Sequence, residues 1–180
     1  MRWFRLLLAF FAAKYRSKLH VTEPSIMPFR VWLTDVDVSI MNHAAMMTVM
    51  EAGRIDLMVR CGFLRLARKQ KWYFPTSSIS VQFLRPLKIF QRAVLTTRIL
   101  HVSPANIYLE QKITRGEKQM AGCIVRGMVK KGKETLDIPS IIGQLGGVSI
   151  PGATPDLVTA FEKQNFMLKE HLNSLEQQGI

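Results

Sequence analysis

The stretch 42–59 restricts the fold more than any other part of the sequence, because its apolar side chains leave no continuous polar face. Its apolar members are Ala44, Ala45, Met46, Met47, Val49, Met50, Ala52, Ile55, Leu57, Met58 and Val59. A helix that is apolar nearly all round is buried on most sides. Gly62 follows and is a usual signal for the end of a helix. We therefore predict one long helix enclosed by the rest of the chain.

Four strand-like runs follow this helix and are separated only by short turn segments. Their cores are residues 78–84, 91–102, 106–114 and 118–130. Short connections between long strands imply an antiparallel meander. A further short strand, Phe29–Thr34, is predicted ahead of the helix. One sheet must then curl around one helix to bury it, which predicts the α+β class and the arrangement called the hotdog fold.

The ends of the chain add helices to this single domain. We expect an N-terminal amphipathic helix within 1–22, the sheet-and-helix domain over 28–145, and a C-terminal helix over 153–179. Pro24 and Pro28 mark a linker between the first two. Thr154 is expected to cap the last helix, with Pro155 at its first position.

The N-terminal segment 1–18 has five cations and no acid: Arg2, Arg5, Lys14, Arg16 and Lys18. Its apolar run 6–13 is too short to span a membrane, which takes about 20 residues. One stripe of the expected helix is apolar and consists of Phe4, Leu7, Leu8, Phe11 and Tyr15. This helix either lies on a membrane surface or packs on the domain or on a second subunit, and the pattern leaves both alternatives open.

A net charge of +12 favours anionic partners. We expect no nucleic acid, because the cations are not clustered with exposed aromatic residues. Cys61 and Cys123 are too few for a disulfide framework and are expected to be buried and reduced, which favours a cytoplasmic protein. The four histidines show no metal-ligand spacing, so no metal site is expected. No serine-hydrolase elbow and no phosphate-binding loop is present.

Residues 35–54, DVDVSIMNHAAMMTVMEAGR, resemble the signature of the 4-hydroxybenzoyl-CoA thioesterase-like hotdog family, which reads roughly D-x-D-x-x-G-H-x-N-N-A-x-Y. The resemblance covers about residues 28–145. It implies an acyl-CoA thioesterase of lipid metabolism, acting on an acyl-CoA or acyl-carrier-protein thioester. It also implies a site between two subunits of a homodimer or a dimer of dimers. No separate cofactor is implied, because coenzyme A is part of the substrate.

The resemblance assigns roles to individual residues. Asp37 matches the second acid of D-x-D, which is the nucleophile or general base in family members. Asn42 matches the first Asn, and Glu51 matches the acid on the helix, with Arg54 three residues later. The sequence departs from the signature at the mouth of the site, where the Gly-His positions are missing. There His43 replaces the second Asn and Met46 replaces the Tyr.

Thioester hydrolysis needs an oxygen nucleophile or base and donors for the developing oxyanion. The start of the buried helix supplies free amides, expected from about His43 to Met46. Asp37 lies just ahead of them, where it would attack the carbonyl carbon or activate water. The alternative role for Asp37 is a helix cap. For Glu51 the alternatives are a backup catalyst and a structural ion pair with Arg54, and we favour the pair.

The phosphates of coenzyme A call for exposed cations, and Arg85, Lys88 and Arg92 are the candidates. Asn42 is expected to cap the helix first and to contact substrate second. For His43 the alternatives are a contact with substrate, polarisation of the carbonyl and a structural role. The altered signature also leaves open a protein that binds acyl-CoA or lipid without hydrolysing it. A third alternative is a scaffold docked on the inner face of a membrane through residues 1–18.

Overall fold

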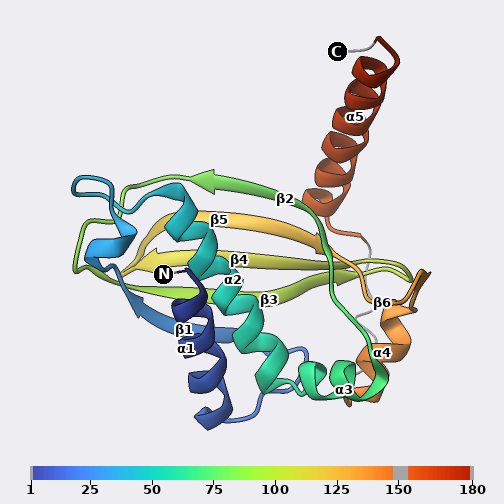
Figure 1. Ribbon diagram of the computed structural model, residues 1–180, viewed down its shortest axis with the longest axis horizontal. Coiled ribbons are helices and arrows are strands. Elements are labelled where there is room, and N and C mark those ends of the chain that lie inside the picture. The colour runs from blue at the N-terminus through green and yellow to red at the C-terminus, as the bar shows by residue number, and fades with distance from the viewer. Residues whose placement is uncertain (1, 148–153, 179–180) are drawn as a thin grey trace.

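A five-stranded antiparallel sheet in the order β1-β3-β4-β5-β2 forms the frame of the molecule (Figure 1). The structure, a computed structural model, describes residues 2–147 and 154–178, with the side chains of residues 2–4 and 178 left out. The strands are β1 Ser25–Arg30, β2 Thr76–Phe83, β3 Arg92–Val102, β4 Ile107–Arg115, β5 Lys118–Gly127, β6 Lys130–Lys131 and β7 Glu134–Thr135. The helices are α1 Arg2–Tyr15, η1 (a short 3-10 helix) Leu33–Asp35, α2 His43–Arg60, α3 Phe63–Gln70, α4 Ile138–Gln144 and α5 Asp156–Gln178.

The sheet curves around α2, so the predicted hotdog arrangement is confirmed. The predicted meander of four strands was wrong for the first of them, because β2 pairs with β5 and not with β3. The core lies between the two, and Met50, Leu95 and Val125 are fully buried there. The helix ends before Gly62, whose φ of 83° lies in the left-handed region. Glycine adopts that conformation without a steric penalty, which explains why the helix stops at this residue.

The first strand does not lie where the sequence predicted it. The prediction was Phe29–Thr34, whereas β1 is Ser25–Arg30 and includes Pro28, which had been read as part of a linker. Pro28 pairs with Val94 of β3, and within the described ranges β1 has no neighbour other than β3. An edge strand tolerates proline because one side of it needs no backbone donor.

The N-terminal helix α1 packs against α2 through the face opposite to its apolar stripe. Ala13 is buried, whereas Leu7, Leu8 and Phe11 are each about half exposed and Tyr15 is 90% exposed. The side chains of Arg2 and Phe4 lie outside the described residues. The alternative of a helix packed on the domain is therefore confirmed, with the stripe turned outward.

Two ion pairs explain which face of α1 turns inward. Arg5 donates to the carboxylate of Asp35, and Arg16 donates to Asp56 at 2.8 Å. Asp56 is 1% exposed and also accepts from Ser25 and from Arg60. Because a buried carboxylate requires partners, these cations of α1 are bound by the domain.

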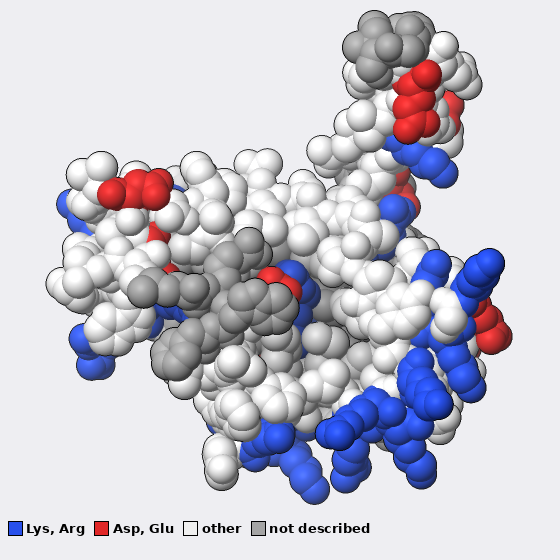
Figure 2. Space-filling model, in the orientation of Figure 1, with Lys and Arg blue, Asp and Glu red and all other residues white. Residues whose placement is uncertain are grey.

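The end of the molecule that contains α3 and the β6–β7 hairpin carries a basic surface. Figure 2 shows Lys and Arg gathered where α3 and the β6–β7 hairpin lie. The exposed cations of these elements and of the residues that flank them are Arg65, Arg68, Lys69, Lys71, Lys131 and Lys133.

The C-terminal helix α5 rests on the sheet with its first turns only, on the face away from α2. Val158 and Phe161 are buried beside Tyr108 and Ile124. The rest of α5 projects past the edge of the sheet near β2 (Figure 1). Among the described residues of this projecting part, Leu168 and Leu172 are more than half exposed.

Candidate functional site

The loop that carries Asp37 is a tight turn at the tip of α2. Val36 pairs with Met41 across it, and the Asp37 amide donates to the Ile40 carbonyl at 3.4 Å. The Met41 amide donates to the carbonyl of Leu87 at 2.7 Å, which ties the loop to the segment between β2 and β3. These backbone bonds fix the position of the loop relative to the start of α2.

Asn42 joins this loop to the helix through both ends of its side-chain amide. Its Oδ1 accepts from the Ala45 amide at 2.7 Å, which is the expected N-cap. Its Nδ2 donates to Asp37 Oδ1 at 3.0 Å. The Asp37 carboxylate is exposed and is held beside the positive end of α2 by this bond.

Fewer amides are free at this helix start than the sequence suggested. Of the donors expected from His43 to Met46, Ala45 is bound by the cap and the Met46 amide donates to the Asn42 carbonyl at 3.1 Å. The amides of His43 and Ala44 have no acceptor among the described residues. These two amides are therefore the candidate donors for an oxyanion.

A groove of about 830 Å³ lies between α1, the start of α2 and the segment before the Asp37 loop. Its lining consists of Arg5, Leu8, Trp32, Leu33, Thr34, Asp35, Asn42, Ala44, Ala45 and Thr48. Trp32 and Leu33 are exposed at 53% and 67%, and so present apolar surface to a ligand. Asp37 is not part of this lining and meets the groove through Asn42.

Asp35 is a groove residue that the sequence analysis did not single out. It is 6% exposed, and its Oδ2 accepts from the Trp32 amide at 2.8 Å while its Oδ1 pairs with Arg5. Its own carbonyl accepts from the Asn42 amide at 2.9 Å. Asp35 is the first acid of the D-x-D pattern, and its place in that pattern could have identified it. Its partner Arg5 lies far away in the sequence, so the pairing itself could not be predicted.

His43 lies outside this groove. It is exposed, and its ring centroid is 4.5 Å from that of Phe83 at the end of β2. His43 is therefore placed between the tip of α2 and the edge strand.

The expected ion pair between Glu51 and Arg54 does not form. Arg54 is buried and donates to Gln111 Oε1 at 2.9 Å, while Gln111 donates to Thr97 Oγ1 and to the Met50 carbonyl, each at 2.8 Å. Burial lowers the pKa of Arg54 below its ordinary value, and the charge of the nearby Glu51 offsets part of this fall. Glu51 is half-buried, two turns along α2 from the helix start.

Two of the three candidate cations for coenzyme A, Arg85 and Lys88, lie on the segment that joins β2 to β3, and Arg92 follows it. All are exposed: Arg85 donates to the Gln119 carbonyl at 2.8 Å, Lys88 pairs with Ile40 of the Asp37 loop, and Arg92 begins β3. Lys88 is thus the one that the backbone brings next to the loop.

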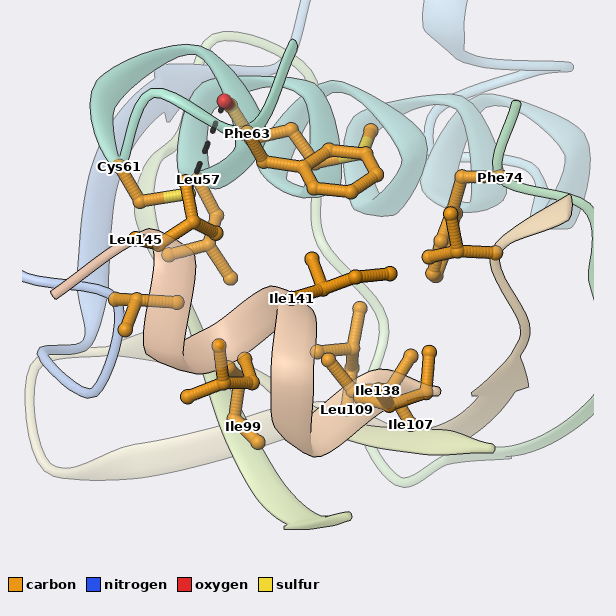
Figure 3. Close-up of a pocket in the computed structure, with 14 residues that line it drawn as sticks. Leu57, Cys61, Phe63, Phe74, Ile99, Ile107, Leu109, Ile138, Ile141 and Leu145 are labelled. Atoms are coloured by element: carbon orange, nitrogen blue, oxygen red, sulfur yellow. Dashed lines mark hydrogen bonds between the residues drawn. The ribbon is translucent and has the colours of Figure 1, made fainter. Parts of the chain in front are cut away.

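An apolar cavity of about 50 Å³ lies at the opposite end of the domain (Figure 3). Side chains from α2, α3, α4 and the sheet point into it, among them Leu57, Phe63 and Ile141. Leu57 is fourteen residues beyond His43, or about 21 Å along the helix axis. The cavity is too small for an acyl chain and is not part of the groove.

The described residues contain no cluster of three or more His, Cys, Asp or Glu side chains. Cys61 is half-buried and Cys123 buried, and both are free thiols, so only Cys123 reaches the burial that was expected of the pair. Within the described ranges, no helix is both long enough and apolar enough to cross a membrane.

Both the sequence and the fold are similar to those of known proteins. The model of the thioesterase-like superfamily matches residues 31–151. No curated protein matches the sequence. A probable thioesterase from Bartonella henselae superposes with a TM-score of 0.59 at 24% identity, covering 65% of this chain and 100% of that one.

Two further solved structures share the fold at lower identity. A probable thioesterase from Escherichia coli has a TM-score of 0.62 and 16% identity, covering 67% of this chain and 94% of that one. A Staphylococcus aureus protein solved in complex with CoA has a TM-score of 0.60 and 12% identity, covering 78% and 96%.

Proposed function

Because the chain belongs to the thioesterase-like superfamily, we propose that it hydrolyses an acyl-CoA or acyl-carrier-protein thioester at the N-terminal tip of α2. The observation that carries the proposal is the hydrogen bond from Asn42 to Asp37, which holds a carboxylate beside a helix start with two free amides. The complex of the Staphylococcus aureus protein with CoA supports a CoA thioester as substrate. The narrower likeness to 4-hydroxybenzoyl-CoA thioesterases is part of the same proposal.

In the proposed reaction the substrate carbonyl oxygen accepts from the amides of His43 and Ala44. Asp37 takes a proton from water, the resulting hydroxide attacks the carbonyl carbon, the carbon–sulfur bond breaks, and the thiolate leaves and is protonated by Asp37 or by water. Alternatively the carboxylate attacks the carbonyl carbon directly, the carbon–sulfur bond breaks to give a mixed anhydride and a thiolate that water protonates, and a second water then cleaves the anhydride. The products are a carboxylic acid and a free thiol, and the reaction needs no separate cofactor or metal.

The other assigned residues have supporting roles in this proposal. Arg85, Lys88 and Arg92 would contact the phosphates of coenzyme A as charged donors, and His43 would contact the substrate at the mouth of the site. The groove lined by Trp32, with walls of apolar residues, suits an acyl chain.

The test of the proposal is release of free thiol from a panel of acyl-CoA substrates. Asp37→Ala is expected to lower kcat by about 100-fold or more, in the range for loss of a general base. Ser39→Ala, a change in the same exposed loop, is the matched control and should leave the rate unchanged. Equal rates in wild type and D37A remove Asp37 from the mechanism.

Glu51→Gln separates the two candidate carboxylates. We expect it to retain activity, because Glu51 lies two turns from the free amides. A variant E51Q that is inactive beside an active D37A would make the helix glutamate the base. A protein whose Tm rises with acyl-CoA while no thiol is released would be the binding protein of the alternative.

We also propose that residues 1–18 contact the surface of an anionic membrane, with the protein located in the cytoplasm on its inner face. The support is the outward stripe of Leu7, Leu8 and Phe11 next to Lys14, whose ammonium lies 4.6 Å from the ring centroid of Phe10. Apolar residues beside cations are typical of helices that lie in a bilayer interface. The free thiols Cys61 and Cys123 support a reducing compartment.

Co-sedimentation with vesicles that contain anionic phospholipid tests the membrane contact. The variant L7S/L8S/F11S is expected to reduce the pelleted fraction severalfold, while L157S, an equally exposed leucine on α5, serves as the control. The same pelleted fraction in both variants and in wild type would contradict the proposed contact.

A further inference from the structure

Five apolar residues of α5 and one asparagine form a continuous seam from the docked turns into the projecting turns. The seam consists of Val158, Phe161, Asn165, Leu168, Leu172 and Leu175, whereas the exposed Phe166 and Met167 lie off it. Its steps alternate between three and four residues, which is the spacing of a helix–helix seam in coiled coils. The face of α5 that docks on the sheet is therefore the same face that leaves the sheet.

The docked part of the seam is fixed by specific contacts near the edge strand β2. Glu162 pairs with Arg126 of β5 at 2.6 Å, and Asn165 accepts from the hydroxyl of Ser78 in β2. Beyond Asn165 the helix has left the sheet, and Leu168 and Leu172 are 55% and 52% exposed. The projecting arm, residues 166–178, begins where the sheet ends.

An arm of this length does not form a stable helix by itself. Thirteen residues are about the minimum at which even alanine-rich helices become marginal in water. The arm also leaves two leucines of its seam, Leu168 and Leu172, more than half exposed within the described part of the chain. An apolar seam is thus open to a partner surface just beyond β2.

The position and the charges of the arm point to a second copy of this chain as the partner. Among the described strands β2 pairs with β5 alone, so its outer edge is open for another strand directly beside the arm. The charges that flank the arm seam have both signs: Lys169 and Glu176. An anionic bilayer would instead favour a wide apolar face with a basic border.

The arm is also complementary to itself. Lys169 and Glu176 lie on the same side of the seam, seven residues apart and on either side of Leu172. When two arms pack antiparallel about Leu172, the Lys169 end of one arm lies next to the Glu176 end of the other, and like charges are kept apart. We propose that α5 is a dimerisation arm, which packs antiparallel on the same arm of a second copy beyond β2. This inference does not depend on the proposed hydrolysis.

Cysteine cross-linking on the full chain tests the arm contact. In a Cys61→Ser background, Leu172→Cys is expected to give mostly covalent dimer under mild oxidation, because residues at the centre of an antiparallel pair approach within the roughly 7 Å that a disulfide allows. Glu170→Cys, on the outer side of the same turn, is the matched control and should cross-link at least about fivefold less. A yield for L172C no higher than for E170C overturns the proposal.

Charge reversal provides a second test that depends on pairing with a like arm. In the L172C background, Lys169→Glu and Glu176→Lys should each lower the cross-linked fraction, and the double variant should restore it. A double variant that stays as low as the single variants would contradict the antiparallel pair. If wild type instead pellets with anionic vesicles and L168E/L172E does not, while L172C forms no dimer, the seam contacts lipid and the proposal is wrong.

Discussion

Asn42 has two separate tasks, because its Oδ1 caps α2 and its Nδ2 holds Asp37. Asn42→Ser keeps an oxygen for the cap and removes the amide donor, so we expect the unfolding free energy to change by only a few tenths of a kcal/mol. We expect kcat for thioester hydrolysis to fall about tenfold, which corresponds to about 1.4 kcal/mol for the lost bond to the carboxylate.

Asn42→Ala removes both contacts and should lower kcat similarly while destabilising the protein by about 1 kcal/mol. Denaturant unfolding and steady-state kinetics on the two variants separate the tasks. If N42S keeps full activity, the bond to Asp37 is not part of the mechanism.

Ionisation of the Cys123 thiol makes the free energy of unfolding depend on pH in the alkaline range. Burial raises the pKa of this thiol to about 11, and the charge of Arg54 partly offsets this rise. In the unfolded chain the thiol ionises near its ordinary pKa of 9.0, so its contribution to stability is fully present below pH 9. The contribution is lost as the pH rises from 9 towards 11, because the unfolded state then releases a proton that the folded state keeps.

Unfolding in denaturant at pH 8 and at pH 11 measures this loss. Wild type should lose about 2 kcal/mol more than Cys123→Ala over that interval, since each pKa unit corresponds to about 1.4 kcal/mol. An equal loss in both proteins would mean that the thiol ionises freely in the fold.

The roles of residues with local partners could be predicted, and those with distant partners could not. The cap at Asn42 follows from its position before an apolar helix, and the structure confirms it. The prediction of a pair between Glu51 and Arg54 was wrong. Arg54 instead binds Gln111 of β4, and the spacing of residues along a helix gives no information about partners on other elements. The pairing of Asp35 with Arg5 escaped prediction for the same reason.

Among the elements, α2 lies in close contact with β3 at Gly53. A β-carbon there would lie 2.4 Å from Leu95 Cδ2 and 2.8 Å from Thr97 Oγ1. Gly53→Ala must displace these buried side chains or the helix, and we expect a loss of about 1–3 kcal/mol in unfolding free energy.

Gly143 in α4 is the matched control, because a β-carbon there meets nothing within 4 Å. Gly143→Ala should raise the unfolding free energy by up to about 1 kcal/mol through helix propensity alone. Thermal or denaturant unfolding of the two variants gives the comparison. A stabilising G53A would contradict the close contact between α2 and β3.

The order and type of the main elements were predictable because periodicity is local, whereas three placements were not. The predicted meander puts β2 beside β3, but β2 pairs with β5. The bounds of β1 were missed because Pro28 argues against a strand unless the strand is known to be an edge. The face of α1 that turns inward could not be predicted from its hydrophobicity alone. The ion pairs of Arg5 with Asp35 and of Arg16 with Asp56 determine which face of α1 turns inward.

At the scale of the whole molecule, the net charge of +12 should draw anionic substrates towards the protein. We expect KM for an acyl-CoA to rise severalfold when ionic strength increases from about 0.01 to 0.15 M, where the screening length falls from about 30 to about 8 Å. The kcat should stay nearly constant. The same acyl group on neutral N-acetylcysteamine is the control, and its KM should not respond to salt. A response equal for both substrates would exclude long-range attraction.

The strand order has a consequence for how the chain is made. Synthesis proceeds from the N-terminus, so α2 and β2 leave the ribosome before β5, which is the only strand that pairs with β2. Until the meander of β3, β4 and β5 is complete, the apolar surface of α2 has no sheet to cover it. The nascent chain is therefore most open to aggregation, and most dependent on chaperones, in the interval between the emergence of α2 and that of β5.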